Sequence, residues 1–298
     1  MKRWRKLTDT NQSRFFSDQK NIIKARLLRI LAGIALGAAV ATKWNGLGYA
    51  LSLWVWENWQ RKKETQGETE ETGTNRAFFQ WKYIVYGLFI PGVVYGLSWW
   101  PHLWLTGERF GDVHATLLNF HYQLDSGGHA ACSRWYTWPL LTKPFPYWYE
   151  EAGASVHTVN NMGNPLLWWL SSAAMMLLVI EGIGRLKDKR LLRRAEAFRM
   201  TDLSLYLVIG YVSNWLPWVL ISRCTYIYLY MPAAVFSFMV LAWLLSEWLH
   251  SPVRKVRAIG WIVLGAIALA AWFWLPLALG SPLSPEGLRM RWWLRSWI

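Results

Sequence analysis

The chain has 298 residues, 54% of them hydrophobic and 24 of them tryptophan, and its formal net charge at pH 7 is +14. Apolar runs of about 20 residues match the length that a helix needs to cross a bilayer, so the composition excludes an ordinary soluble domain. Lysine and arginine cluster between these runs instead of along one face, which argues against nucleic-acid binding.

The runs predict an all-α fold, a multi-pass transmembrane helical bundle of about six spans with one long extracytoplasmic loop. In chain order, a basic N-terminal segment (1–29) precedes two spans joined by a polar link (30–99), the loop (100–163), and a four-span domain with a short tail (164–298). The predicted spans lie near 30–56, 79–99, 164–184, 203–222, 226–249 and 257–279. The strand-like alternation that a transmembrane barrel requires is absent from them.

Basic clusters in short connections predict the orientation. RLKDKRLLRR (185–194) and VRKVR (253–257) mark the cytoplasmic side, which places the loop 100–163 and the turn around Arg223 outside. A single crossing at 30–56 would, however, leave the basic N-terminus outside. Either this run is a broken pair of half-helices, since ATKWNGLG at its centre allows a break, or earlier spans of a longer protein impose the orientation.

Three histidines in the long loop are the first candidates for chemistry: His114, His121 and His129, which precede Arg134. His114 and His121 are seven residues apart and would share one face of a helix. Packing against neighbouring aromatic side chains is the alternative for each of them. No pair of histidines or cysteines has the close spacing of a structural zinc site, so we expect no metal.

Two cations are the next candidates. Arg223, in SRCTYIYLYMP at the end of one predicted span, has a planar guanidinium that matches phosphate geometry, and Tyr228 and Tyr230 follow it. Lys43 lies near the middle of an apolar run, where a cation is costly and is by default a functional hypothesis. The alternatives are an arginine that snorkels to the interface without a ligand, and a lysine outside the hydrocarbon at a helix break.

Several motifs resemble those of the protein O-mannosyltransferases, a family of multi-spanning glycosyltransferases. HAACSRWYTWPL (129–140) is similar to the family pattern His-Pro-Tyr-Ser-Ser-x-Trp-Tyr-x-Trp-Pro-Leu and keeps Ser133, Trp135 and Trp138. Four other segments resemble family elements in the same order: LAGIALGAAVATKWNGL, HATLLNFHYQL, SRCTYIYLYMPA and the tail PLSPEGLRMRWWLRSWI. The resemblance covers residues 28–298.

The resemblance implies transfer of mannose from a polyprenyl- or dolichyl-phosphate carrier to serine or threonine hydroxyls of proteins, with inversion at the sugar carbon. The partners would be polyprenyl-phosphate-mannose, an acceptor protein and membrane lipids, with no cofactor beyond the lipid-linked donor. The loop has no domain-sized insertion, which favours a bacterial form in the plasma membrane. The residues expected to bind substrate are Lys43, His114, His121, His129, Ser133, Arg134, Trp135, Trp138, Arg223, Tyr228 and Tyr230.

Three departures from the family pattern shape this prediction. The family's presumed catalytic Asp-Glu pair has no counterpart among the outer acidic residues, so we assign no catalytic residue. Leu229 replaces the histidine of Tyr-His-Tyr, and Ala130-Ala131-Cys132 replaces Pro-Tyr-Ser. We therefore expect the C-terminal part of such an enzyme, which is either a split-gene subunit, a fragment or a decayed copy. In the first case a separate N-terminal half is a further partner. That half would also supply the earlier spans that the orientation requires.

Three rival functions stay open. One is a non-catalytic membrane subunit that scaffolds or regulates a glycosyltransferase, and another is a polyprenyl-phosphate glycosyltransferase that acts on lipid. The third, a transporter or flippase, would require ionisable residues facing one another near the midplane of several spans. The predicted orientation also places Cys132 and Cys224 outside, where a disulfide between them is one hypothesis.

Overall fold

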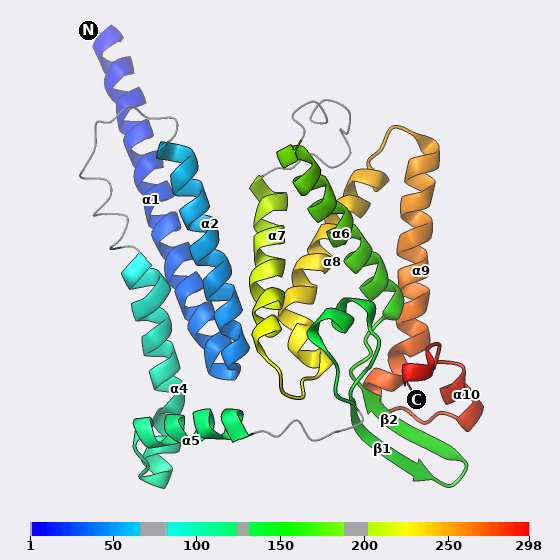
Figure 1. The fold of residues 1–298 in the computed structure, drawn as a ribbon. Helices are drawn as coiled ribbons and strands as arrows, with labels where there is room; N and C mark the ends of the chain where they lie inside the picture. The colour runs from blue at the N-terminus through cyan, green and yellow to red at the C-terminus, as the bar shows by residue number, and fades with distance from the viewer. Residues whose placement is uncertain (1, 66–80, 82, 124–130, 188–201, 298) are drawn as a thin grey trace. The chain divides into compact units, whose positions relative to one another are not determined.

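The computed structural model describes residues 2–65, 81, 83–123, 131–187 and 202–297 (Figure 1). The chain divides into two compact units, one formed by Met1–Ala50 with Arg61–Leu118 and the other by Leu51–Gln60 with Asn119–Ile298. The first half of the chain contains α1 (Lys2–Thr42), α2 (Leu47–Thr65), a π-helical stretch (Tyr83–Phe89), α4 (Ile90–Thr106) and α5 (Phe110–Gln123).

In the first unit, α1 packs against α4 and the π-helical stretch before it. Two glycines of α1 make this possible, because a Cβ atom on Gly33 would lie 2.7 Å from the Tyr86 carbonyl oxygen and one on Gly37 would lie 2.7 Å from that of Pro91. Small residues spaced four apart let two membrane helices approach closely enough for their backbones to touch.

The predicted span 30–56 is broken at Lys43. Helix α1 ends at Thr42, Lys43 is extended (φ −163°, ψ 138°), and a single 3-10 turn, Trp44–Gly46, leads into α2. Gly46 lies directly against α1: a Cβ atom added at this position would be 2.7 Å from the Ala39 carbonyl. The structure therefore confirms the alternative of two helices, and a single continuous crossing at 30–56 is wrong.

The second unit is built around α8 (Met231–Leu249), which contacts α6 (Pro165–Lys187), α7 (Asp202–Trp215) and α9 (Arg254–Leu279). Its small residues Ala233 and Ala234 are almost completely buried. At Gly210 of α7, a Cβ atom would overlap the Phe236 ring of α8. Close helix contact again depends on a position without a side chain.

The long loop contains regular structure that we did not predict. A 3-10 helix spans Trp135–Leu140, and the strands β1 (Pro146–Ala152) and β2 (Ser155–Asn160) form an antiparallel hairpin. The tail after α9 contains the short helix α10 (Pro285–Arg289) and a final 3-10 turn, Arg295–Trp297. Leu283 of the tail pairs with Val156 of β2, so β2 lies between β1 and the tail (Figure 1).

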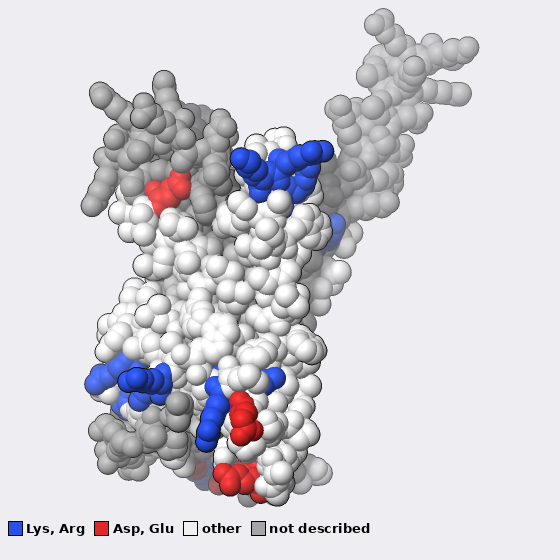
Figure 2. Space-filling view, turned by 90° about the vertical axis from the view of Figure 1, so that its right-hand side faces the viewer, with Lys and Arg blue, Asp and Glu red and all other residues white. Residues whose placement is uncertain are grey.

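Six of the described helical segments are long and apolar enough to cross a membrane. They are Ile22–Thr42, Tyr83–Thr106, Pro165–Ile183, Asp202–Leu220, Ile227–Leu249 and Arg254–Leu279. Figure 2 shows the face that includes α9, where a broad band of uncharged side chains separates charged ones at its two ends. In α9 itself the cations Arg254, Lys255 and Arg257 stand in the first turn, and no charged residue follows within the helix. The predicted all-α membrane bundle is confirmed.

Candidate functional site

The segment Trp135–Leu140 is held in place by tryptophan side chains from α6, α7 and the tail. Their indole N–H groups donate hydrogen bonds to backbone carbonyls of this 3-10 helix and of Leu141, which follows it. The bonds run from Trp168 to Trp138 (2.8 Å), Trp169 to Leu140 (2.8 Å), Trp215 to Trp135 (3.0 Å) and Trp297 to Leu141 (2.7 Å). Four of the chain's 24 tryptophans thus fix this loop against the helices and the tail.

Three of the predicted substrate-binding side chains, those of Ser133, Trp138 and Tyr230, are buried. Trp138 is fully buried and donates to the hydroxyl of the buried Ser133 (2.9 Å). Tyr230 is 1% exposed, and its hydroxyl shares a hydrogen bond with that of Tyr211 (2.9 Å). All three are buried and hydrogen-bonded, so in this structure they support the loop, and their assignment to substrate stays a prediction. Trp135, partly exposed, packs edge-on against Trp215.

A disulfide and two hydrogen bonds join the loop to the turn that carries Arg223. Cys132 bonds to Cys224, which confirms the disulfide hypothesis. Next to it, the Ser133 N–H donates to the Thr225 carbonyl (2.8 Å) and the Thr225 hydroxyl donates to the Ser133 carbonyl (2.7 Å). We call this disulfide and the two hydrogen bonds the clamp. Arg134 and Arg223 are each adjacent in sequence to a residue of the clamp, which therefore fixes the position of their backbones.

Beside Arg223 lies a group of four aromatic side chains, Phe145, Tyr147, Tyr226 and Tyr228, which we name the aromatic cluster. Tyr228 stacks on Tyr226 (ring centroids 5.6 Å apart) and on Tyr147 (6.4 Å), while Phe145 meets Tyr226 edge-on (4.8 Å). Arg223 is close enough to Tyr228 for an electrostatic interaction. All four rings are at least partly exposed, so they can meet a ligand.

The aromatic cluster and Arg223 combine two kinds of recognition. Exposed ring faces pack against the C–H faces of a sugar, and a guanidinium binds phosphate oxygens through directed hydrogen bonds. Partial burial raises the pKa of Tyr147, which outweighs the opposing effect of its hydrogen bond to Asn161. Its hydroxyl is therefore neutral at physiological pH and does not repel an anionic ligand.

The sequence motifs predict Tyr228 as a substrate residue but do not point to Phe145 and Tyr147. The signal was present in the sequence Phe-Pro-Tyr, which spans the start of β1. A proline between two aromatic residues marks an extended segment, in which both rings can be displayed. What the sequence could not indicate was that this segment meets the tyrosines that follow Arg223.

In the first unit, His114 belongs to a chain of hydrogen bonds. The Trp44 indole donates to the Tyr95 hydroxyl (2.9 Å), which bonds to His114 Nε2 (2.6 Å), and His114 Nδ1 bonds to the Phe110 carbonyl (2.7 Å). Since the carbonyl can only accept, Nδ1 carries the proton and Nε2 accepts from the tyrosine. With both nitrogens engaged, His114 props the turn next to Lys43 instead of presenting a nitrogen to a ligand.

Lys43 is exposed at the break between α1 and α2, as the helix-break alternative predicted. His129 lies outside the described residues, and His121 lies in α5 with its side chain also outside them. Arg134 is exposed. Within the described part of the chain, no group of three His, Cys, Asp or Glu side chains could hold a metal ion.

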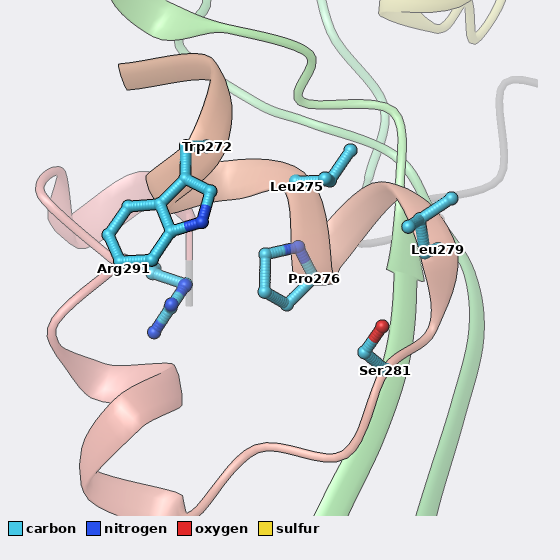
Figure 3. Close-up of a pocket in the computed structure, with 6 residues that line it drawn as sticks. All are labelled: Trp272, Leu275, Pro276, Leu279, Ser281 and Arg291. Carbon is cyan, nitrogen blue, oxygen red and sulfur yellow. The ribbon is translucent and has the colours of Figure 1, made fainter. Parts of the chain in front are cut away.

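A separate pocket lies where the tail returns to the end of α9 (Figure 3). Its lining is mostly apolar and consists of Trp272, Leu275, Pro276, Leu279, Ser281 and Arg291. The Arg291 guanidinium donates from Nε to the Phe273 carbonyl (2.8 Å) and from Nη1 to the Gly287 carbonyl (2.6 Å), and burial lowers its pKa. This arginine thus fastens the tail to α9, and we assign the pocket a structural role.

The clamp yields a stability prediction. Replacing both Cys132 and Cys224 with serine should lower the free energy of unfolding by about 2–4 kcal/mol, because the cross-link closes a long loop in the unfolded chain. Thermal unfolding of the detergent-purified protein measures this, and a reductant should produce the same shift in the unmodified chain. The double variant is the control and should not respond to reductant. An unmodified chain equally stable with and without reductant would contradict the prediction.

Together these features define the class: a multi-pass helical membrane protein whose tryptophan-fixed loop is cross-linked to a turn that carries an arginine beside an aromatic surface. Residues 106–297 match the family model for the C-terminal four-transmembrane region of protein O-mannosyltransferases. Residues 11–107 match the model for dolichyl-phosphate-mannose-protein mannosyltransferases. The chain belongs to the protein O-mannosyltransferase family.

Individual relatives agree with this assignment. The polyprenol-phosphate-mannose–protein mannosyltransferase of Mycobacterium tuberculosis is 26% identical over 92% of this chain and 58% of its own length. Dolichyl-phosphate-mannose–protein mannosyltransferase 5 of Saccharomyces cerevisiae is 23% identical over 64% of this chain and 26% of its own length. The chain therefore spans somewhat over half of the mycobacterial relative.

Among solved structures, the S. cerevisiae Pmt1–Pmt2 complex bound to the sugar donor is similar, with a TM-score of 0.53 and 21% sequence identity. The match covers 63% of this chain and 26% of that one. At this identity the likeness bears on the fold alone. It agrees with the helical membrane architecture described above.

Proposed function

We propose that this chain is the C-terminal part of an inverting membrane mannosyltransferase that moves mannose from a polyprenyl-phosphate carrier to serine or threonine hydroxyls of proteins. The observation that carries the proposal is Arg223, which the Cys132–Cys224 clamp holds beside the aromatic cluster in a chain of this family. A phosphate and a sugar are the two groups that such a site suits.

In this reaction the acceptor oxygen attacks the sugar carbon C1 while the bond from C1 to the phosphate oxygen breaks. The electron pair of that bond leaves with the phosphate, and a base takes the hydroxyl proton. Arg223 would stabilise the leaving phosphate, and the aromatic cluster would hold the sugar. Lys43, exposed at its helix break, is a second candidate for the donor phosphate.

The base is assigned to a partner. Glu150 and Glu151, the acidic residues in sequence nearest to the aromatic cluster, lie on the exposed strand β1 and do not match the family's Asp-Glu motif. We infer that a separate N-terminal half supplies the catalytic carboxylate. The residues His121, His129 and Arg134 of the loop are assigned to the sugar or the acceptor only as predictions.

We also propose that the loop and the Arg223 turn face the outside of a bacterial plasma membrane. This orientation requires α2, which is not among the six candidate spans, to return through the membrane after the break at Lys43. The basic N-terminal segment and Arg61, Lys62 and Lys63 at the end of α2 would then all lie inside.

The test is mannose transfer in membranes. We expect transfer of radiolabelled mannose from polyprenyl-phosphate-mannose to a Ser/Thr peptide when this chain is co-expressed with a candidate N-terminal half, and none when either is expressed alone. Label recovered in lipid instead of peptide would replace the proposal with a lipid glycosyltransferase. No transfer, with both chains inserted and stable, would favour a scaffold subunit, a function that the missing carboxylate motif also fits.

A further inference from the structure

The outer edge of β1 is an open strand edge. Its inner edge pairs with β2, and β2 is in turn paired with Leu283 of the tail and packed against α9 and α10. All seven residues of β1 are exposed. Among the described residues, no other strand pairs with its outer edge.

The pairing determines which backbone groups point outward. Val156 exchanges both of its backbone hydrogen bonds with Leu283 (2.8 and 3.0 Å), so its N–H and C=O face away from β1. Its partner across the hairpin is Glu151, and two residues further along Tyr149 faces Thr158. Since backbone groups alternate sides along a strand, the N–H and C=O of Tyr149 and of Glu151 point toward the open edge.

This edge leads directly into the candidate site. A bulge in the pairing lies between Pro146 and Trp148, at the residue Tyr147 that stacks on Tyr228 in the aromatic cluster. A strand advances about 3.3 Å per residue, so Tyr149 and Glu151 lie about 7 and 13 Å beyond Tyr147. In a peptide paired with this edge, the residues two to four positions beyond the paired stretch would therefore reach the aromatic cluster and Arg223.

Unpaired strand groups in alternating order are complementary to one kind of ligand, the backbone of an extended polypeptide. We propose that the outer edge of β1 binds the acceptor peptide as a third strand and delivers its serine or threonine to the aromatic cluster. This inference rests on the proposed function. The carboxylates of Glu150 and Glu151 add a preference for acceptors with basic residues in the paired stretch.

The edge is shaped for this role by its own side chains. The Tyr149 hydroxyl donates to the Glu151 carboxylate (2.7 Å), a bond that raises the pKa of Tyr149 and ties the two side chains together on one face of the strand. The open edge between them is left uncovered. Binding through the backbone would accept many sequences, as an enzyme that modifies varied proteins requires.

The first experiment changes the peptide and leaves the protein intact. Two versions of one Ser/Thr peptide are N-methylated on alternate residues between two and five positions from the acceptor residue. One version is methylated at the second and fourth positions and the other at the third and fifth, and we call these the two frames. One frame removes the N–H groups that face Tyr149 and Glu151, and the other does not. With the assembled enzyme, we expect KM to rise about tenfold in one frame only, at nearly unchanged kcat. Equal effects of the two frames would overturn the proposal.

The second experiment changes the strand. Tyr149→Pro removes the outward N–H, whereas Tyr149→Thr removes the ring and keeps that N–H. We expect about a tenfold higher peptide KM for Tyr149→Pro than for Tyr149→Thr, with the same KM for the lipid donor. Because the Tyr149 N–H does not pair with β2, neither change should unfold the hairpin. Equal peptide KM values in the two variants would count against the inference.

A third readout separates this inference from the proposed function. A Ser/Thr peptide that carries a photo-crosslinker is irradiated with the full chain in nanodiscs, and the labelled residues are mapped by mass spectrometry. Label on β1 that an unmethylated competitor removes would support peptide docking, even if no mannose is transferred. Mannose transfer without any label on β1 would overturn the docking inference and leave the proposed function standing.

Discussion

Replacement of Arg223 by alanine is expected to lower mannose transfer by the assembled enzyme at least about a hundredfold. Loss of one donor to the charge that develops in a transition state typically costs about 10²–10³ in rate. Arg223 lies beside the aromatic cluster at the clamped turn, where the phosphate of the proposed donor would gain a further negative charge as it leaves. The measurement is the initial rate of radiolabelled mannose transfer to a Ser/Thr peptide.

The control variants for Arg223 separate charge from geometry. Arg223→Lys keeps the charge without the planar fork and should recover part of the rate. Arg289→Ala removes an exposed arginine on α10 and should leave the rate unchanged. All variants should keep the Cys132–Cys224 disulfide on a non-reducing gel. Full activity of Arg223→Ala would remove this residue from the donor site and leave Lys43 as the candidate cation.

Replacement of Gly37 by leucine should disrupt the packing of α1 against α4. A Cβ atom there would lie 2.7 Å from the Pro91 carbonyl oxygen and 2.8 Å from the Val94 Cβ, and backbone atoms cannot move aside without separating the helices. We expect a loss of about 3 kcal/mol or more in the free energy of unfolding. The matched control is Gly92→Leu on α4, where nothing lies within 4 Å of the added carbon.

Thermal aggregation of the detergent-purified variants measures this difference. Gly37→Leu should melt well below the unmodified chain, and Gly92→Leu should melt close to it. A more conservative pair, Gly37→Ala and Gly92→Ala, should show the same order with a smaller difference, because only the first carbon is added. Equal melting temperatures within either pair would mean that α1 and α4 do not pack through this glycine.

The membrane architecture was predictable because it depends on contiguous residues. Apolar runs of sufficient length led to six predicted spans, and the six candidate spans of the structure overlap them one to one. Continuity at 30–56 was left open, because hydrophobicity alone does not show where a helix ends. The extended conformation of Lys43 and the close contact of Gly46 with Ala39 end the helix although the run stays largely apolar.

The candidate site was predictable only in part. The motif WYTWPL and the residue Arg223 pointed to the correct two segments, and the disulfide that joins them was one hypothesis. The sequence could not separate side chains that support the loop from those that face outward. Trp138 and Tyr228 are both aromatic residues near a membrane surface, yet the first is fully buried and the second is partly exposed.

The sequence by itself determined the membrane class, the number of spans and the family resemblance, since hydrophobic length and local motifs are properties of neighbouring residues. The tertiary structure decided which residues meet: Cys132 with Cys224, 92 residues apart, and the Trp297 indole with the Leu141 carbonyl, 156 residues apart. It also decided that β1 has an open edge, because an unpaired edge depends on how every other strand is paired. Such contacts arise only when the chain packs, and no local pattern specifies them.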